Sequence, residues 1–158
     1  CGKSSVGRRL SQLLCCPFMD LDQVIEERTG RSIPEIFSRD GEPEFRRIEL
    51  EALKHIVGER PSLVLALGGG AVMTAECAEI VHSDTICIYL KASVETLMEH
   101  LSGQTDGRPM LGDSDLRTRI EELMALRSDT YEKTAHIVID TDGKSIEAVA
   151  SEIISKLA

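Results

Sequence analysis

The chain has little positive charge, no long apolar run and no recognisable signal peptide. Its 158 residues carry 18 lysines and arginines against 27 aspartates and glutamates, which gives a net charge of −9. This acidic balance argues against a nucleic-acid or anionic-membrane surface, although a small anionic substrate needs only a few local arginines. No apolar stretch reaches the length needed to cross a bilayer, so no membrane association is expected.

The cysteines and histidines show neither a disulfide nor a metal-binding pattern. The five cysteines are odd in number and contain no C-x-x-C pair, and the four histidines are scattered along the chain. We therefore expect neither a disulfide framework nor a zinc site, and the usage indicates a reducing, cytoplasmic location. With 42% hydrophobic and 28% charged residues, the composition is typical of one soluble globular domain.

Predicted strands and helices alternate along the chain. Apolar runs predict strands at 17–19, 63–67, 85–90 and 135–140. Helical periodicity or capping patterns predict helices at 4–14, 22–28, from Ser32 to a break at Gly41, 42–58, 75–81, from Ser93 onward, 114–131 and at the C-terminus. This alternation predicts an α/β fold, a three-layer α/β/α sandwich around a parallel sheet, with ligands at the carboxyl ends of the strands.

The first residues match the end of a phosphate-binding loop, G-x-x-x-x-G-K-[ST]. Gly2, Lys3, Ser4 and Ser5 open a predicted helix, where backbone N–H groups and the helix dipole favour an anion. Lys3 would reach the outer phosphates of ATP and the Ser4 hydroxyl would bind Mg²⁺. Taken alone, so short a match favours a solvated lysine at a helix start, but the rest of the chain reverses that preference.

A D-x-D pair follows the first predicted strand. Asp20 or Asp22 could simply cap the next helix. Beside a phosphate loop, one carboxylate can instead hold a water of Mg²⁺ while the other orients an acceptor hydroxyl. Their spacing at a strand end predicts that they point in different directions, which suits two roles.

Three consecutive glycines, Gly68, Gly69 and Gly70, follow the strand predicted at 63–67. Three in a row suggest that backbone approaches a ligand closely.

The segment 102–113 is rich in glycine and holds Arg108, which is either a solvated loop charge or an arginine of a lid that stabilises the transferring phosphoryl group.

Two further arginines have competing interpretations. Arg46 lies on a helix among glutamates, and the pattern slightly favours surface ion pairs over a fork that binds a carboxylate or phosphate. Arg127 precedes Tyr131 by four residues, which is typical of a pair on a helix surface.

Taken in order, these segments resemble shikimate kinase. The likeness lies in GKSSVGRRLSQLL, FMDLDQVIEERTGRSIPEIFSRDGEPEFRRIELEAL, LALGGGAV, GRPML and the R-x-x-x-Y-x-x-x-A pattern from Arg127 to Ala135. The second block is the specific one, because other small phosphate-loop kinases share only the first. The resemblance implies a P-loop NTPase fold of the nucleoside monophosphate kinase type. It implies one domain over 1–158, with a shikimate-binding region at about 21–50 and a lid at about 102–113.

The resemblance also implies the reaction, which is transfer of the ATP γ-phosphoryl group to the 3-hydroxyl of shikimate in the route to chorismate and the aromatic amino acids. It implies Mg²⁺ as the cofactor, bound by Ser4 and, through water, by Asp20. By the same resemblance, Lys3 contacts the β- and γ-phosphates, Asp22 activates the hydroxyl, and Arg108 is the lid arginine that stabilises the transferring phosphoryl group. Arg46 and Arg127 bind the shikimate carboxylate, with Arg46 oriented by Glu49. The backbone at Gly68, Gly69 and Gly70 closes on the ring.

The sequence departs from the family pattern in two places. Leu101 stands where many members carry an arginine that packs on adenine, so adenine contacts are expected elsewhere, around residues 141–145. The family's strand before the phosphate loop lies at the centre of the sheet, and the chain starts inside that loop. We therefore expect a fragment with the first central strand absent, unstable and nearly inactive by itself because flanking strands lose hydrogen-bond partners.

Two alternative functions remain at this point. One is a phosphate-loop kinase for another acceptor, such as gluconate or a nucleoside monophosphate. The other is a kinase-like domain that binds without turnover. The joint retention of six residues argues against it: Lys3, Asp20, Asp22, Arg46, Arg108 and Arg127. We expect a monomer that binds shikimate and ATP, with no nucleic acid or membrane partner.

Overall fold

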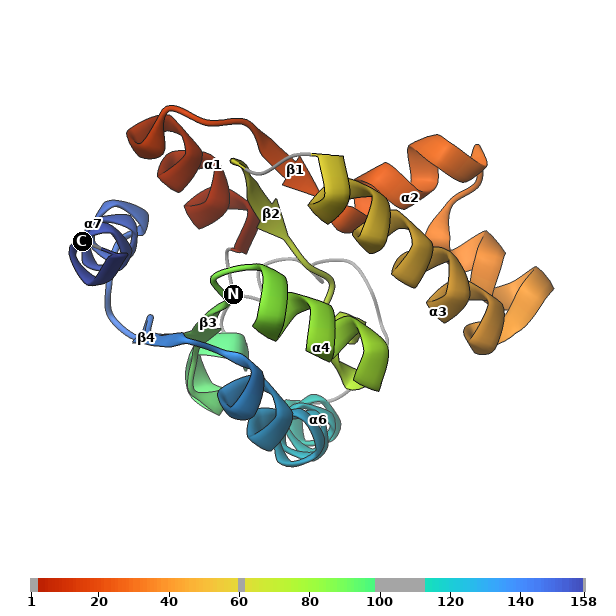
Figure 1. Cartoon of the computed structure of the whole chain (residues 1–158). Coiled ribbons are helices and arrows are strands. Elements are labelled where there is room, and N and C mark those ends of the chain that lie inside the picture. The colour runs from red at the N-terminus through yellow and green to blue at the C-terminus, as the bar shows by residue number, and fades with distance from the viewer. Residues whose placement is uncertain (1–2, 60–61, 99–112, 158) are drawn as a thin grey trace.

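The computed structural model describes residues 3–59, 62–98 and 113–157 (Figure 1). Helices and strands alternate in the predicted order. The elements are α1 (Lys3–Leu14), β1 (Phe18–Asp20), α2 (Leu21–Thr29), α3 (Ile33–Glu59), β2 (Val64–Ala66), a 3-10 turn η1 (Ala71–Met73), α4 (Ala75–Asp84), β3 (Ile88–Lys91), α6 (Asp113–Thr134), β4 (Ile137–Asp140) and α7 (Ile146–Leu157). Residues 94–98 are also helical, behind the Ser93 hydroxyl that accepts the N–H of Thr96.

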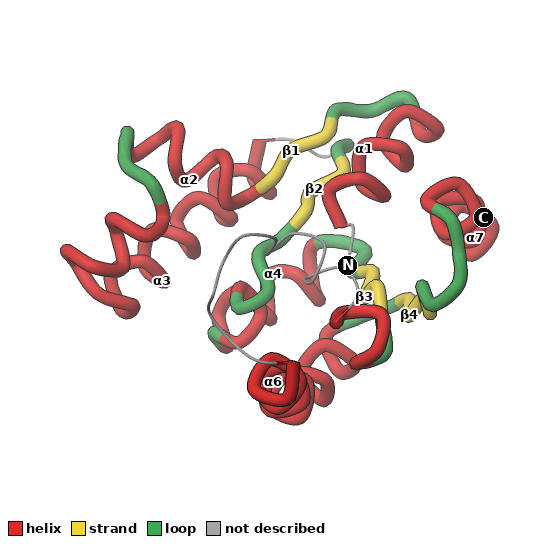
Figure 2. Tube along the Cα trace, turned by 180° about the vertical axis from the view of Figure 1, so that it is seen from behind, coloured by secondary structure: helices red, strands yellow, loops and turns green. Residues whose placement is uncertain are grey.

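The described strands form two parallel pairs. β1 pairs with β2, with Phe18 opposite Val64, and β3 pairs with β4, with Ile88 opposite Ile137. No strand among the described residues joins the two pairs, which Figure 2 shows apart from each other. A cavity of about 1040 Å³ with mainly apolar walls is lined by residues of both β2 and β3. The strands were predicted to form a single sheet, and in the described residues they form two separate parallel pairs.

Helices cover both faces of these strands. On one face, α1 and α7 bury Val6, Leu10, Val149 and Ile153 against β4. On the other face, residues of α3, η1 and α4 form a second buried cluster, against which Leu65 of β2 and Tyr131 of α6 pack. Val64 and Leu65 of β2 are partly buried and pack against different clusters, as expected for a strand with helices on both sides. The three-layer α/β/α prediction is confirmed.

The region at 21–50 comprises α2 and the first two-thirds of α3. Asp20 caps α2, and Gly30 ends it in the left-handed conformation. Within α3, Gly41 has φ 84° and ψ 169°, so the chain breaks there as the sequence predicts. Leu21, Ile25, Ile36, Phe45 and Ala52 form the shared core of the two helices. This core fixes the side chains that α2 and α3 present to β2.

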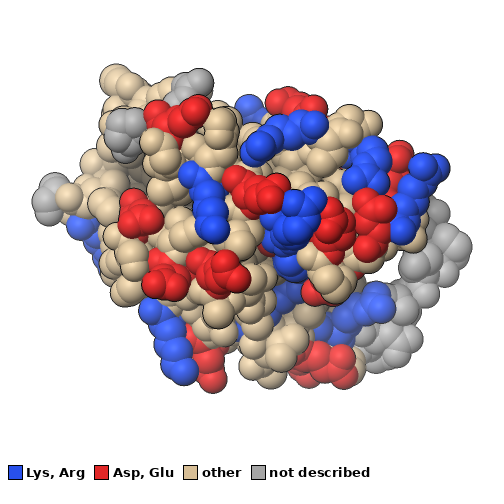
Figure 3. Space-filling model, turned by 45° about the vertical axis from the view of Figure 1, so that its right-hand side comes forward, with Lys and Arg blue, Asp and Glu red and all other residues tan. Residues whose placement is uncertain are grey.

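The charged surface contains both signs over the face drawn in Figure 3, where acidic and basic side chains are interspersed. Most of the described ion pairs are exposed, such as those of Arg47 with Glu44 and Glu51. No described helix has both the length and the apolar character to span a membrane. His55, His82 and His136 are exposed.

Candidate active site

The start of α1 lies against the ends of β1 and β2. The Lys3 ammonium donates a hydrogen bond to the Leu67 carbonyl at 2.9 Å, and the Ser4 hydroxyl donates to Asp20 Oδ2 at 3.2 Å. Loss of water around the ammonium lowers the pKa of Lys3, and this effect outweighs the opposing carboxylates of Asp22 and Asp20. The phosphate-loop lysine, its serine and the D-x-D pair are thus brought together as predicted. Ser5 is exposed in the first turn of α1, and Gly2 lies outside the described residues.

Asp20 uses its two carboxylate oxygens differently. Oδ1 accepts the backbone N–H groups of Asp22 (2.9 Å) and Gln23 (3.3 Å), which caps α2, while Oδ2 accepts from Ser4. The capping interpretation and the functional one are therefore compatible for this residue. Asp22 belongs to the first turn of α2, so the separation of the two carboxylates results from the strand-to-helix turn. Residues two apart on a strand share a face, so the spacing argument made from the sequence was wrong.

Each of the three glycines faces a different charged side chain. A Cβ atom on Gly68 would lie 2.9 Å from Asp22 Oδ1, and one on Gly69 would lie 2.8 Å from Arg127 Nη1. A Cβ on Gly70 would overlap the Arg46 guanidinium. The glycines therefore leave room for a carboxylate and two guanidinium groups, which meet at the end of β2.

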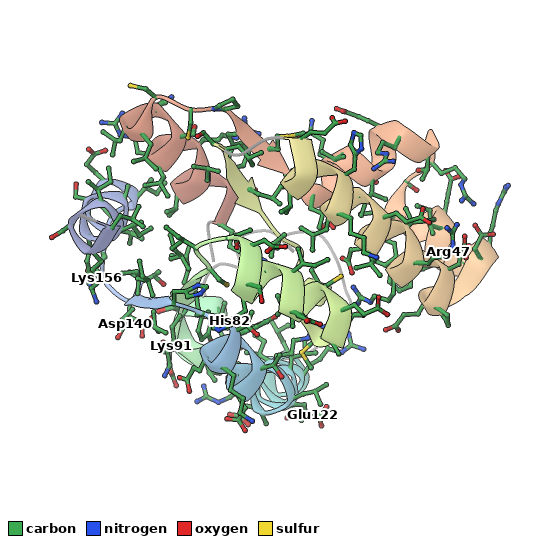
Figure 4. The ribbon with its side chains drawn as sticks, viewed as in Figure 1. Arg47, His82, Lys91, Glu122, Asp140 and Lys156 are labelled. Carbon is green, nitrogen blue, oxygen red and sulfur yellow. The ribbon has the colours of Figure 1, made fainter. Side chains whose placement is uncertain are left out.

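Arg46 is held by a buried acid. Its Nη1 donates to Glu49 Oε1 at 2.8 Å, and Glu49 is only 1% exposed. Burial raises the pKa of Glu49, and Arg46 opposes that rise. Arg46 is 22% exposed, whereas the neighbouring Arg47 is 55% exposed and lies on the α3 ribbon well away from the strands (Figure 4). The predicted surface ion pair of Arg46 exists, with the exposed Glu42 at 3.6 Å. The shorter contact is with the buried Glu49, and this contact orients the guanidinium toward Gly70.

Arg127 also faces the glycine turn rather than forming a helix-surface pair. Its Nε is buried and has no hydrogen-bond partner among the described residues. A buried N–H of this kind carries a free-energy cost unless a ligand accepts from it. Four residues on, the Tyr131 hydroxyl donates to the Gly69 carbonyl, a contact that the sequence analysis missed. The four-residue spacing was the available signal, since it places both side chains on one helix face.

Charged groups of both signs meet in this candidate site. Burial, followed by the neighbouring Asp20 carboxylate, raises the pKa of Asp22, while Lys3 and Arg46 oppose the rise. Two carboxylates, one ammonium and two guanidinium groups thus share a small volume. Such an arrangement can hold a small anion by two arginines, place a hydroxyl against Asp22, and receive phosphate at Lys3.

A model of one protein family, described as "Shikimate kinase", matches residues 1–158. The chain belongs to the shikimate kinase family. It is 43% identical over 156 residues to the shikimate kinase of Thermus thermophilus, covering 99% of this chain and 84% of that protein. It is 40% identical to the shikimate kinase of Rhodococcus erythropolis, covering 99% of this chain and 90% of the relative.

Solved structures of the shikimate kinase family superpose on most of the chain. The shikimate kinase of Acinetobacter baumannii, solved in complex with shikimate, gives a TM-score of 0.84 at 32% identity and covers 99% of this chain and 86% of that one. The enzyme of Bacteroides thetaiotaomicron gives 0.86 at 25% identity, with 99% and 92% covered. These neighbours confirm the P-loop α/β fold. Arg108 and the segment 102–112 predicted as a lid lie outside the described residues.

Replacement of Asp22 by asparagine is expected to stabilise this shikimate kinase family fold at neutral pH. Because the folded-state pKa of Asp22 is raised, stability is lost as the pH rises from the unfolded pKa through the folded one, and the loss persists at pH 7. The neutral amide avoids it, so we expect Tm at pH 7 to rise. Thermal melts from pH 7 down to about pH 4 check this, since the gap in Tm should narrow as the pH falls toward the unfolded pKa of an aspartate. An unchanged Tm at pH 7 would count against the raised pKa.

Alanine at Gly70 is expected to disturb substrate binding more than stability. The new Cβ would meet the end of the Arg46 side chain, which can shift, but only by leaving the position that Glu49 fixes. We expect the KM for the family's substrate, shikimate, to rise about tenfold, the effect of one lost charge-assisted contact. Gly58→Ala is the matched control, because a Cβ there meets nothing within 4 Å and an exposed helix gains about 0.5–1 kcal/mol from alanine. Equal KM values for the two variants would refute the crowding argument.

Proposed function

We propose that this protein transfers the γ-phosphoryl group of ATP to the 3-hydroxyl of shikimate, giving shikimate 3-phosphate and ADP. The observation that carries the proposal is the convergence of Asp22, Arg46 and Arg127 on the three glycines after β2. Membership of the shikimate kinase family supports the same assignment. The reaction would place the protein in the route to chorismate and the aromatic amino acids.

Shikimate is a small carboxylate with neighbouring hydroxyl groups, and each end has a suitable partner here. Arg46 and Arg127 offer paired N–H donors to the carboxylate, including the buried Nε of Arg127 that otherwise has no described partner. Asp22 lies on α2, whereas the two arginines lie on α3 and α6, and it accepts the proton of the reacting hydroxyl. Its raised pKa favours this task, because a more basic carboxylate is a better proton acceptor at neutral pH. The backbone of Gly68, Gly69 and Gly70 closes on the ring without side chains in the way.

The phosphate end of the proposed site is the start of α1. Lys3, with Gly2 and Ser5, contacts the phosphates, and transfer then depends on position and charge more than on covalent chemistry. Within the described residues, no group of three or more His, Cys, Asp or Glu side chains could hold a metal by itself. The Ser4 hydroxyl and Asp20 Oδ2 lie 3.2 Å apart and suit Mg²⁺, which binds through few protein oxygens, substrate phosphates and waters. When bound, Mg²⁺ would supply neutralisation of phosphate charge. Arg108 is proposed to do the same from the lid.

Every residue placed in this proposed site comes from one chain, so we propose that the protein acts as a monomer. We also propose a cytoplasmic location, where ATP is available, and neither a nucleic-acid nor a membrane partner. Residues around 141–145 are proposed to contact adenine.

A coupled ADP-release assay on the full-length protein tests the proposal. With ATP and Mg²⁺ present, release is expected to depend strongly on added shikimate and to be weak with gluconate or a nucleoside monophosphate. Faster ADP release with another acceptor would identify that acceptor as the substrate of the site. A folded protein that binds ATP and releases no ADP with any of them would be a binding domain, and the proposed reaction would be wrong.

A further inference from the structure

Tyr131 of α6 makes a contact with the glycine turn that the catalytic roles above do not use. Its hydroxyl donates a hydrogen bond to the carbonyl oxygen of Gly69, 62 positions earlier in the chain. The ring packs against Tyr89 of β3, with ring centroids 5.1 Å apart and an interplanar angle of 58°. It also packs against the cluster that contains Leu53 and Val81. The hydroxyl is therefore presented by a ring that packing already holds in place.

This hydrogen bond sets the direction of the middle peptide of a turn that the Ala71 N–H closes on the Gly68 carbonyl. The peptide between Gly69 and Gly70 has a glycine on each side, and glycine crosses φ/ψ space with little steric penalty. In a planar trans peptide the C=O and N–H groups point to opposite sides. Fixing the Gly69 carbonyl toward Tyr131 therefore directs the Gly70 N–H away from Tyr131.

Arg127 and Tyr131 contact the same glycine from one face of α6. The position of a Cβ on Gly69 would lie 2.8 Å from Arg127 Nη1 and 3.5 Å from the Tyr131 hydroxyl. Residues four apart on a helix lie one above the other, so one turn of α6 holds both the guanidinium and the peptide in register. The same turn of α6 therefore positions both the glycine turn, through Tyr131, and the Arg127 guanidinium.

We propose that Tyr131 is a positioning residue for shikimate: its hydroxyl holds the Gly69–Gly70 peptide so that the Gly70 N–H is presented to the substrate. This role rests on the proposed function, because it names a further determinant of the same site. Tyr131 takes no part in proton or phosphoryl transfer. It acts on the bound substrate only through the backbone of the glycine turn, so its removal should weaken substrate binding and leave the phosphate end intact.

The test is Tyr131→Phe in the full-length protein, which removes the hydroxyl and keeps the ring. We expect the KM for shikimate to rise about tenfold, the effect of one lost hydrogen bond with a carbonyl left unpaired, while the KM for ATP changes less than about twofold. The matched control is Tyr89→Phe, which removes a hydroxyl from the other ring of the pair and should leave both KM values unchanged. In ¹H–¹⁵N spectra without substrate, the Gly70 amide signal should move in Tyr131→Phe and stay in place in Tyr89→Phe.

The outcomes separate this inference from the proposed function. If the unsubstituted protein turns over shikimate and Tyr131→Phe keeps its KM for shikimate, the positioning role alone is overturned. It is also overturned if Tyr131→Phe lowers Tm and raises the KM values for shikimate and ATP equally, because that pattern would indicate a general loss of packing. If the unsubstituted protein does not turn over shikimate, the proposed function fails, and this role fails with it.

Discussion

Replacement of Asp22 by asparagine is expected to lower kcat for shikimate-dependent ADP release by about a thousandfold, the middle of the range for loss of a positioned general base. The amide keeps the size of the side chain and its place beside Gly68, where a Cβ would come within 2.9 Å of a carboxylate oxygen. It cannot accept the proton of the reacting hydroxyl. The variant therefore removes the proposed proton acceptor and leaves the shape of the site unchanged.

Three measurements make the Asp22→Asn result specific. The KM for ATP should stay close to that of the unsubstituted protein, because Lys3 and Ser4 occupy the other end of the site. Asp129→Asn, an exposed position on α6, is the matched control and should leave kcat unchanged. Tm is expected to rise in Asp22→Asn, and a measured Tm no lower than that of the unsubstituted protein excludes unfolding as the cause of the lost activity. A kcat within about tenfold of the unsubstituted protein would mean that Asp22 is not the base.

Much of the fold could be predicted because local patterns decide local structure. Buried strands read as apolar runs, and α2 and α3 carry their own start and stop residues, such as Asp20, Gly30 and Gly41. The pairing of strands was less accessible, because it depends on contacts between distant segments. The alternation predicted one sheet, and the described strands form two parallel pairs.

The site shows the same division between local and distant contacts. The Lys3, Ser4 and Asp20 arrangement follows from a motif and from the rule that strand ends gather ligands. The fit of each glycine to one side chain could not be read from the sequence, because it joins β2 to α2, α3 and α6 in space. The contact between Tyr131 and Gly69 was missed for the same reason.

Arg46 and Arg47 show most clearly what sequence alone could not decide. They are adjacent, carry the same charge and have glutamates at similar spacing, so the pattern favoured ion pairs for both. About 100° of helical rotation per residue separates their directions. Arg46 meets buried Glu49 and the Gly70 backbone, whereas Arg47 pairs with the partly or fully exposed Glu44 and Glu51.

Arg46→Ala is therefore expected to raise the KM for shikimate by about a hundredfold, and Arg47→Ala by less than about twofold. Both variants remove one positive charge from the same helix, so a general electrostatic effect would move them together. Only the first removes a donor that faces the glycine turn. Initial-rate kinetics with varied shikimate would measure the difference, and similar KM values for the two variants would remove Arg46 from the proposed site.

Arg46→Ala also leaves Glu49 as a buried acid without its partner, which is expected to destabilise the fold by about 3–5 kcal/mol. Adding Glu49→Gln separates this structural effect from substrate binding. The glutamine removes the unpaired charge, so the double variant should recover most of the lost stability in urea unfolding. Its KM for shikimate should remain high, because no guanidinium faces the substrate carboxylate. Recovery of KM together with stability would show that Arg46 serves the fold alone.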